Sequence, residues 1–219
     1  MRAIFMLLGM SMFSVTAVAN PSDARLGTIA VAMMTHGAAR PPHGFVAFCH
    51  EHEADCRAEG PTERVLLTAE RLFELEAVNQ DVNESIRPMT DRDLYGTDEH
   101  WALPVDSGDC EDYALLKRRI LIGMGWPTSA LLLTVVRDER GEGHAVLTAR
   151  TSLGDLILDN KQPHVTFWHE AAYQFVSRQS HFDPRSWVLL GEPGTPSAPA
   201  WVAKVNAVLA ERLIEMLPQ

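Results

Sequence analysis

The sequence predicts an α+β fold in which one helix packs on an antiparallel sheet, with extra helices on the N-terminal side and at the C-terminus. Three observations favour this fold. Apolar residues recur at three- and four-residue steps over residues 62–86 and 110–124, as in amphipathic helices. From residue 130 onward, short apolar or alternating segments are separated by turn residues, as in an antiparallel meander. The 219 residues, 46% of them hydrophobic and 22% charged, suffice for one folded domain.

The N-terminus has the pattern of a secretory signal peptide. Arg2 precedes an apolar run over residues 3–15, and Ala17 and Ala19 form a small-residue cleavage site before Asn20. A membrane anchor is the alternative, but this run is shorter than the about 20 apolar residues that a span requires. We expect cleavage after Ala19 and a periplasmic mature protein.

Three cysteines divide into a close pair and a single residue. Residues 21–40 lack a clear pattern and are expected to form a loose lead, followed by a short strand or turn over 45–48. Cys49 and Cys56 lie seven residues apart, and in an oxidising compartment a disulfide is the natural interpretation. Cys110 is left unpaired, and an odd cysteine in an exported protein calls for an explanation.

A zinc site is the alternative for the paired cysteines, because His50 and His52 lie between them. The spacing Cys-His-x-His-x3-Cys matches no common zinc pattern, so the disulfide is favoured. Apart from His144, the other histidines show no informative spacing and are expected at the surface.

A long helix and an aperiodic loop precede the single cysteine. The helix is expected over residues 62–86, with Thr62 as its N-cap and Pro88 ending it. The loop over 89–108 is polar, and a loop of this length without secondary structure is often functional. It leads directly into Cys110.

A second helix, five strands and a C-terminal extension follow. The helix over 110–124 is expected to be capped by Ser107 or Asp109. The strands are expected over residues 130–136, 144–151, 155–158, 173–176 and 187–190, the first three forming a meander. The chain thus divides into a signal peptide over 1–19, one folded domain over 20–190, and a linker with a terminal amphipathic helix over 191–219.

Cys110 lies at the first turn of its helix, where unpaired N–H groups and the helix dipole stabilise negative charge. A thiol placed there is expected to be acidified toward the reactive thiolate, and the same N–H groups could stabilise an oxyanion. His144 begins the second strand of the meander and Asp159 ends the third, so the two can be cross-strand neighbours beside that helix end. Cys110, His144 and Asp159 are therefore predicted as nucleophile, base and orienting carboxylate, with Asn160 a weaker orienter.

Each of these residues has a plainer interpretation when taken alone. A lone cysteine at a helix start is usually structural, and a lone histidine more often satisfies a local hydrogen bond. The three together, on suitable elements and in this order, favour catalysis.

Three motifs surround the predicted triad: residues 108–113 (GDCEDY), 143–147 (GHAVL) and 154–160 (GDLILDN). With Asn79, Asn83, Tyr95-Gly96, Trp101, Pro104 and the cysteine pair in support, they resemble the bacterial transglutaminase-like cysteine proteinases. These are periplasmic relatives of papain and transglutaminase that include the LapG-type proteases of biofilm adhesins, and the resemblance covers about residues 45–187. It implies a papain-like or transglutaminase-like core with Cys110 as nucleophile, His144 as base and acid, and Asp159 as orienter.

The resemblance also implies calcium, bound by acidic residues that flank the nucleophile. These are Asp109 and Glu111, with Asp112 as a third ligand. Carboxylate oxygens suit Ca²⁺, although three adjacent acids are more than one turn can easily direct at one ion. Helix capping is the alternative, because acids in a first turn interact favourably with the dipole.

Three other polar or aromatic residues are candidates for the site. Asn79 or Asn83, on the preceding helix, could donate to an oxyanion at Cys110, or could equally cap or contact solvent. Trp101 could line a substrate cleft or pack in the core.

The expected function is cleavage of peptide bonds in an exported or surface protein by acyl transfer through the cysteine. The net charge of −10 and the pI near 5.3 argue against nucleic-acid binding. The resemblance points to an adhesin as substrate and to an inner-membrane regulatory protein as partner, and we expect a monomer. Two alternatives are a transglutaminase or amidase that uses the same triad, and a non-catalytic binding module of the same fold.

Overall fold

The second half of the chain, rich in aliphatic and β-branched residues, builds a seven-stranded sheet. The computed structural model describes residues 32–191. Within them the strand order is β1-β9-β8-β4-β5-β6-β7, and every neighbouring pair is antiparallel. The strands are β1 Thr35–Ala39, β4 Leu131–Arg137, β5 Gly143–Thr151, β6 Gly154–Leu158, β7 Thr166–Phe167, β8 Gln174–Gln179 and β9 Trp187–Leu190. The predicted α+β fold with its antiparallel meander, here β4-β5-β6, is confirmed.

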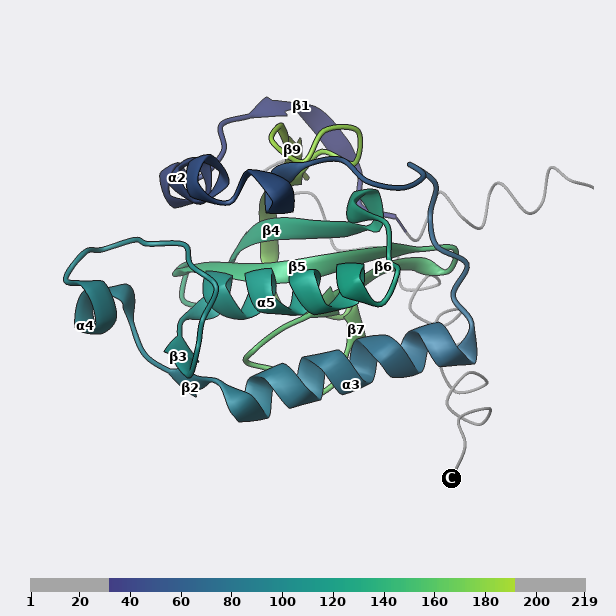
Figure 1. Cartoon of the computed structure of the whole chain (residues 1–219). Coiled ribbons are helices and arrows are strands. Elements are labelled where there is room, and N and C mark those ends of the chain that lie inside the picture. The colour runs from purple at the N-terminus through teal and green to yellow at the C-terminus, as the bar shows by residue number, and fades with distance from the viewer. Residues whose placement is uncertain (1–31, 192–219) are drawn as a thin grey trace, which may run out of the picture.

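Helix α5 (Cys110–Gly123) lies against strands β4 and β5, and α3 (Ala69–Ser85) contacts β6. The other helices are α2 His43–Glu51 and α4 Asp91–Tyr95, with 3₁₀ turns η1 Glu53–Cys56 and η2 Thr128–Ala130. A short parallel pair, β2 Arg87–Pro88 with β3 Ser107–Gly108, closes the loop between α3 and α5. Figure 1 shows α5 crossing the sheet in front of β5, α3 running beside α5, and α4 projecting beyond the end of α5 that follows β3.

Alternation along β5 and β6 assigns side chains to two faces. Leu147, Ala149 and Leu158 belong to the main core, which includes the apolar residues of α3 and α5. Val146 and Ile157 belong to a smaller cluster on the other face. Eight of the nine residues of β5 are buried, because both faces of this strand are covered and α5 packs on one of them.

The N-terminal part differs from the prediction in three places. The expected loose lead over 21–40 contains β1, which pairs with β9 from the far end of the domain, so its partner is invisible in the local sequence. The segment 45–48, expected as a strand or turn, is part of helix α2, in which Phe45, Phe48 and Cys49 are buried in the core. Helix α3 begins after Thr68 and not after Thr62; the Thr68 hydroxyl accepts from Arg71 N at 3.3 Å and so caps the helix.

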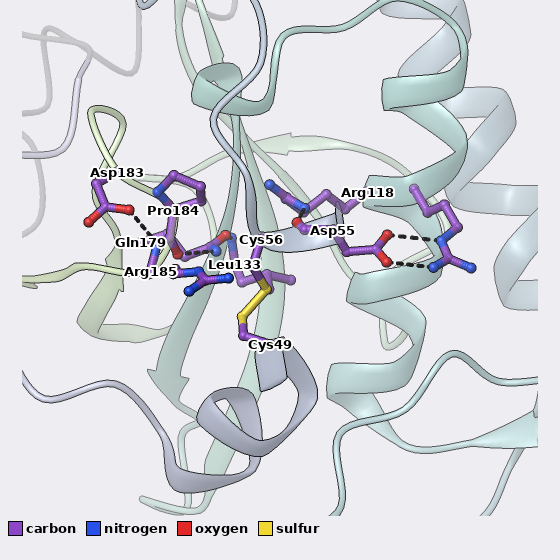
Figure 2. The surroundings of a disulfide bond; sticks show 10 residues. Cys49, Asp55, Cys56, Arg118, Leu133, Gln179, Asp183, Pro184 and Arg185 are labelled. Atoms are coloured by element: carbon purple, nitrogen blue, oxygen red, sulfur yellow. Dashed lines mark hydrogen bonds and ion pairs between the residues drawn. A yellow bond between two sulfur atoms is a disulfide. The ribbon is translucent and has the colours of Figure 1, made fainter. Parts of the chain in front are cut away.

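The Cys49–Cys56 disulfide is present, so the zinc alternative is wrong. Figure 2 shows this bond beside a set of polar contacts that attach η1 to the rest of the domain. The Asp55 carboxylate accepts from Arg119 at 2.6 and 3.0 Å, and Asp55 O accepts from Arg118 Nη1 at 2.7 Å. The disulfide segment is therefore tied to α5, the helix that begins with Cys110.

Some predictions fall outside the described residues. The signal peptide over 1–19 and the terminal helix over 201–217 lie there, as does the linker beyond Gly191. Within residues 32–191, no helix combines the length and apolarity needed to cross a membrane.

Candidate active site

The N-terminus of α5 presents Cys110 at the end of the sheet where β5 begins. Asp109 occupies the N-cap position, but its side chain makes no cap hydrogen bond; its main-chain oxygen accepts from Tyr113 N at 3.2 Å. Gly108 is required just before it, because a Cβ there would lie 2.6 Å from Asp112 Oδ2. The loop therefore reaches the helix by a path that only glycine permits.

The environment of the Cys110 thiol opposes its ionisation. The thiol lies 3.1 Å from Glu111 Oε2, to which it donates. Burial, followed by the Glu111 carboxylate, raises the pKa of Cys110 well above its usual value. Acidification by the helix terminus, expected from the sequence, is therefore wrong for this state, because desolvation and the neighbouring carboxylates outweigh the dipole.

His144 and Asp159 lie together, as the meander predicts. His144 Nε2 and Asp159 Oδ1 are 2.8 Å apart, and the two residues are only 4% and 2% exposed. Burial acts to raise the pKa of Asp159, but hydrogen bonds from His144, Lys161 N and Tyr173 outweigh it and the pKa is lowered. Asp159 is thus held as a carboxylate, so Nε2 carries a hydrogen and Nδ1 is the nitrogen left to accept a proton.

The thiol and the histidine meet at the start of β5. The N–H of Ala145, the residue after His144, is placed to donate to the Cys110 sulfur, and this contact favours the thiolate. No hydrogen bond joins the sulfur to the imidazole ring in this structure, since the thiol is turned toward Glu111. The three predicted residues therefore share one end of the sheet, with His144 and Asp159 in direct contact and Cys110 against the adjacent main chain.

A second cluster of carboxylates lies beside the thiol. Asp91, Asp109 and Asp112 each present an oxygen within 4.8 Å of the others. Asp91 Oδ1, Asp109 Oδ1 and Asp112 Oδ2 are buried and have no hydrogen-bond partner. Burial, with the charges of Asp109 and Asp91, raises the pKa of Asp112 to about 7. Three carboxylates, each with a buried and unsatisfied oxygen, are a donor set that fits a hard divalent cation such as Ca²⁺.

This cluster differs in composition from the predicted ligand set. It contains Asp109 and Asp112 but takes its third member, Asp91, from α4, where Asp91 N donates to Asp109 Oδ2 at 3.3 Å. Glu111 instead shares a group with Asp109 and the thiol, and burial together with the charge of Asp109 raises its pKa to about 8. Nothing in the sequence predicts Asp91 as a ligand, because it reaches Asp109 and Asp112 only when the 89–108 loop folds back on itself.

The two asparagines of α3 hold the turn after β6. Asn83 Nδ2 donates to Asp159 O at 2.9 Å and to Gln162 O at 3.1 Å. Asn79 Nδ2 donates to Gln162 O at 3.1 Å, and its Oδ1 accepts from the buried Lys117 Nζ at 2.8 Å. These amides support the backbone that carries Asp159, and they are not the oxyanion donors considered from the sequence.

Of the remaining candidates, Trp101 packs in the core, and the imidazole is hydrogen-bonded to Asp159 rather than to Asn160. Trp101 is buried and packs edge-on against Phe45 and Trp187, so it belongs to the core and not to a cleft. Asn160 Oδ1 is buried without a partner, and Asp159 is the residue that binds the imidazole. Tyr173, which the sequence did not single out, donates to Asp159 Oδ2 at 2.6 Å.

Comparison with known proteins bears on this arrangement. A family model described as bacterial transglutaminase-like cysteine proteinase matches residues 35–195. Among solved structures, Legionella pneumophila LapG in its calcium-bound form is 21% identical with a TM-score of 0.46, covering 85% of this chain and 96% of that one. The EGTA-treated form is 21% identical with a TM-score of 0.45, covering 78% and 88%. A third LapG structure is 23% identical with a TM-score of 0.45, covering 78% and 87%. A comparison with curated proteins finds no match.

Proposed function

The chain belongs to the bacterial transglutaminase-like cysteine proteinases, and from this membership we propose an exported endopeptidase that uses Cys110, His144 and Asp159 as its triad. One observation carries the assignment of residues. A buried imidazole is hydrogen-bonded to a buried carboxylate at 2.8 Å, and the next residue's N–H reaches the single free cysteine. A nucleophile, a base and an orienter for that base are the groups that acyl transfer requires.

In this proposal the Cys110 sulfur attacks the carbonyl carbon of a peptide bond. His144 Nδ1 takes the thiol proton and then delivers it to the leaving amine, while Asp159 keeps the ring oriented and stabilises the imidazolium. Water then hydrolyses the thioester and restores the thiol. In this mechanism the sulfur turns from Glu111 toward the imidazole, and catalytic hydrogen bonds often tighten only when substrate binds.

We further propose that Asp91, Asp109 and Asp112 hold a calcium ion. Their buried, unpartnered oxygens support this, and the family resemblance led to the same metal with Glu111 in place of Asp91. When bound, the ion would supply positive charge that offsets the carboxylates beside the nucleophile.

Export to the periplasm and cleavage of a surface adhesin, with control by an inner-membrane protein, complete the proposal. The disulfide supports an oxidising compartment, since such bonds persist there and are rare in the cytosol. Sequencing the N-terminus of the protein recovered from a periplasmic fraction tests export. Asn20 is expected as the first residue, and an intact Met1 would contradict it.

Mapping of new N-termini tests the activity. Wild type and Cys110→Ala are incubated with a surface and periplasmic protein extract, with calcium present, and peptides are labelled at their free amines. New termini are expected in the wild-type sample alone. Equal termini in both samples would contradict the proposal, and incorporation of a labelled amine without new termini would indicate transglutamination instead.

A further inference from the structure

Tyr173 occupies an unusual place next to the His144–Asp159 pair. Its hydroxyl donates to Asp159 Oδ2 at 2.6 Å, and its ring centroid lies 5.6 Å from that of His144. It enters this position from the segment before β8, where Tyr173 N donates to Ala171 O at 2.8 Å. The residue thus contacts both members of the pair and belongs neither to β5, which carries His144, nor to the turn after β6, which carries Asp159.

The two oxygens of Asp159 have separate partners. Oδ1 receives His144 Nε2 at 2.8 Å and Lys161 N at 3.0 Å. Oδ2 receives the Tyr173 hydroxyl alone among the described residues. Without that hydroxyl, the buried Oδ2 would lose its only donor within residues 32–191. Hydrogen bonds would then hold the carboxylate through Oδ1 alone.

A pocket of about 460 Å³ adjoins the contact between Asp159 and Tyr173. Both residues line it, together with Asp138, Lys161 and Glu170 among others. Rotation of the Asp159 side chain toward this space would lengthen its bond to the imidazole. A donor at Oδ2 opposes that rotation, as partners of metal- and base-orienting carboxylates do elsewhere.

We infer that Tyr173 is a positioning residue of the catalytic pair: its hydroxyl fixes the orientation of the Asp159 carboxylate and thereby that of the His144 ring. The inference rests on the proposed triad. It assigns Tyr173 no contact with the reacting atoms, so its removal should slow turnover without weakening substrate binding.

Tyr173→Phe tests this by removing the donor while keeping the ring. The matched control is Tyr113→Phe, which removes a buried hydroxyl that donates to Ile86 O, away from Asp159. Hydrolysis of p-nitrophenyl acetate gives kcat and KM without knowledge of the natural substrate. Tyr173→Phe is expected to lower kcat roughly ten- to a hundredfold with KM unchanged, whereas Tyr113→Phe lowers thermal stability and leaves kcat within about twofold of wild type.

A spectroscopic readout separates this inference from the proposed function. The His144 Nε2 proton, identified by its loss in Asp159→Asn, should give a downfield proton resonance that shifts and exchanges faster with water in Tyr173→Phe. An unmoved resonance in folded Tyr173→Phe, or an unchanged kcat while Cys110→Ala is inactive, would overturn the role of Tyr173. If wild type and Cys110→Ala hydrolyse the ester equally, the proposed function fails and the resonance alone decides.

Discussion

Lys117 illustrates how burial sets the properties of single residues around α5. The side chain is 1% exposed, and Nζ donates to Asn79 Oδ1 at 2.8 Å. Burial lowers the pKa of Lys117 to about 7, although the charge of Asp159 acts in the opposite direction. Cys110 is half-buried, and desolvation followed by the Glu111 carboxylate raises the pKa of its thiol, so both groups are pushed toward their neutral forms.

Because the pKa of Lys117 is lowered in the folded protein, the free energy of unfolding should rise with pH. Below a pH of about 10.5 the unfolded chain holds the lysine proton, whereas the folded protein releases it above about 7. The unfolded state therefore binds more protons between these values, and stability rises with pH there. Compared with Lys117→Met, wild type should gain roughly 2–4 kcal/mol of unfolding free energy between pH 7 and pH 10.

Urea denaturation of both proteins at several pH values measures this difference. The pH dependence is the test, because Lys117→Met also loses the hydrogen bond to Asn79 at every pH. Parallel curves for the two proteins would show that the buried lysine keeps an ordinary pKa.

At the scale of elements, α3 supports the active-site turn by side-chain amides. Asn83→Ala removes the two hydrogen bonds to Asp159 O and Gln162 O. Loss of stability by about 1–2 kcal/mol is expected, with a severalfold lower kcat, because Asp159 is attached to that turn. Thermal unfolding and ester hydrolysis are the measurements, and Asp81→Ala, exposed on the same helix, is the control. Equal behaviour of the two variants would show that the turn holds its shape without α3.

The disulfide segment is hydrogen-bonded to the C-terminal half of α5. Arg118 and Arg119 both bind Asp55, one residue before Cys56. The double variant Cys49→Ser/Cys56→Ser should lose roughly 2–4 kcal/mol of unfolding free energy, since the unfolded chain is no longer cross-linked. Urea denaturation checks this, and a reductant should lower wild type to the same value while leaving the double variant unchanged. A reductant effect on the double variant would point to another cause.

At the scale of the whole molecule, the sequence predicted best what depends on local pattern. The strands of the meander and helix α5 appear within a residue or two of their expected bounds, because alternation and three- to four-residue spacing mark buried faces. The two-residue β7 and the edge strand β1 were missed, since short strands depend on partners distant in the chain.

The candidate site was predictable to a similar degree and for similar reasons. The His144–Asp159 contact follows from antiparallel register, but Asp91 and Tyr173 reach the site through loop paths that no spacing reveals. The direction of the Cys110 pKa shift was also missed, because desolvation depends on burial and on Glu111, which a helix position alone does not specify.

Calcium should stabilise the domain as one unit. The three aspartates join the α4 loop to the first turn of α5, and α5 packs in the same core as α2, α3 and β9. A ligand that binds only the folded state adds about 2.7 kcal/mol at a hundredfold excess over its Kd, so calcium should raise the melting temperature of the whole described core. Tryptophan fluorescence, which includes Trp187 on β9, and far-ultraviolet circular dichroism should shift together when calcium replaces EGTA.

Asp91→Asn is the variant that tests the composition of this calcium site. The substitution removes the one carboxylate of the cluster that does not lie near Cys110 in the sequence. The variant should fold in EGTA but lose most of the calcium-dependent rise in melting temperature. Glu111→Gln is the contrasting variant, because Glu111 lies against the thiol and outside the three-aspartate cluster. Retention of the shift in Asp91→Asn with its loss in Glu111→Gln would place the ion among the residues that flank Cys110, as the sequence-based set had it, and would require a different arrangement of α4.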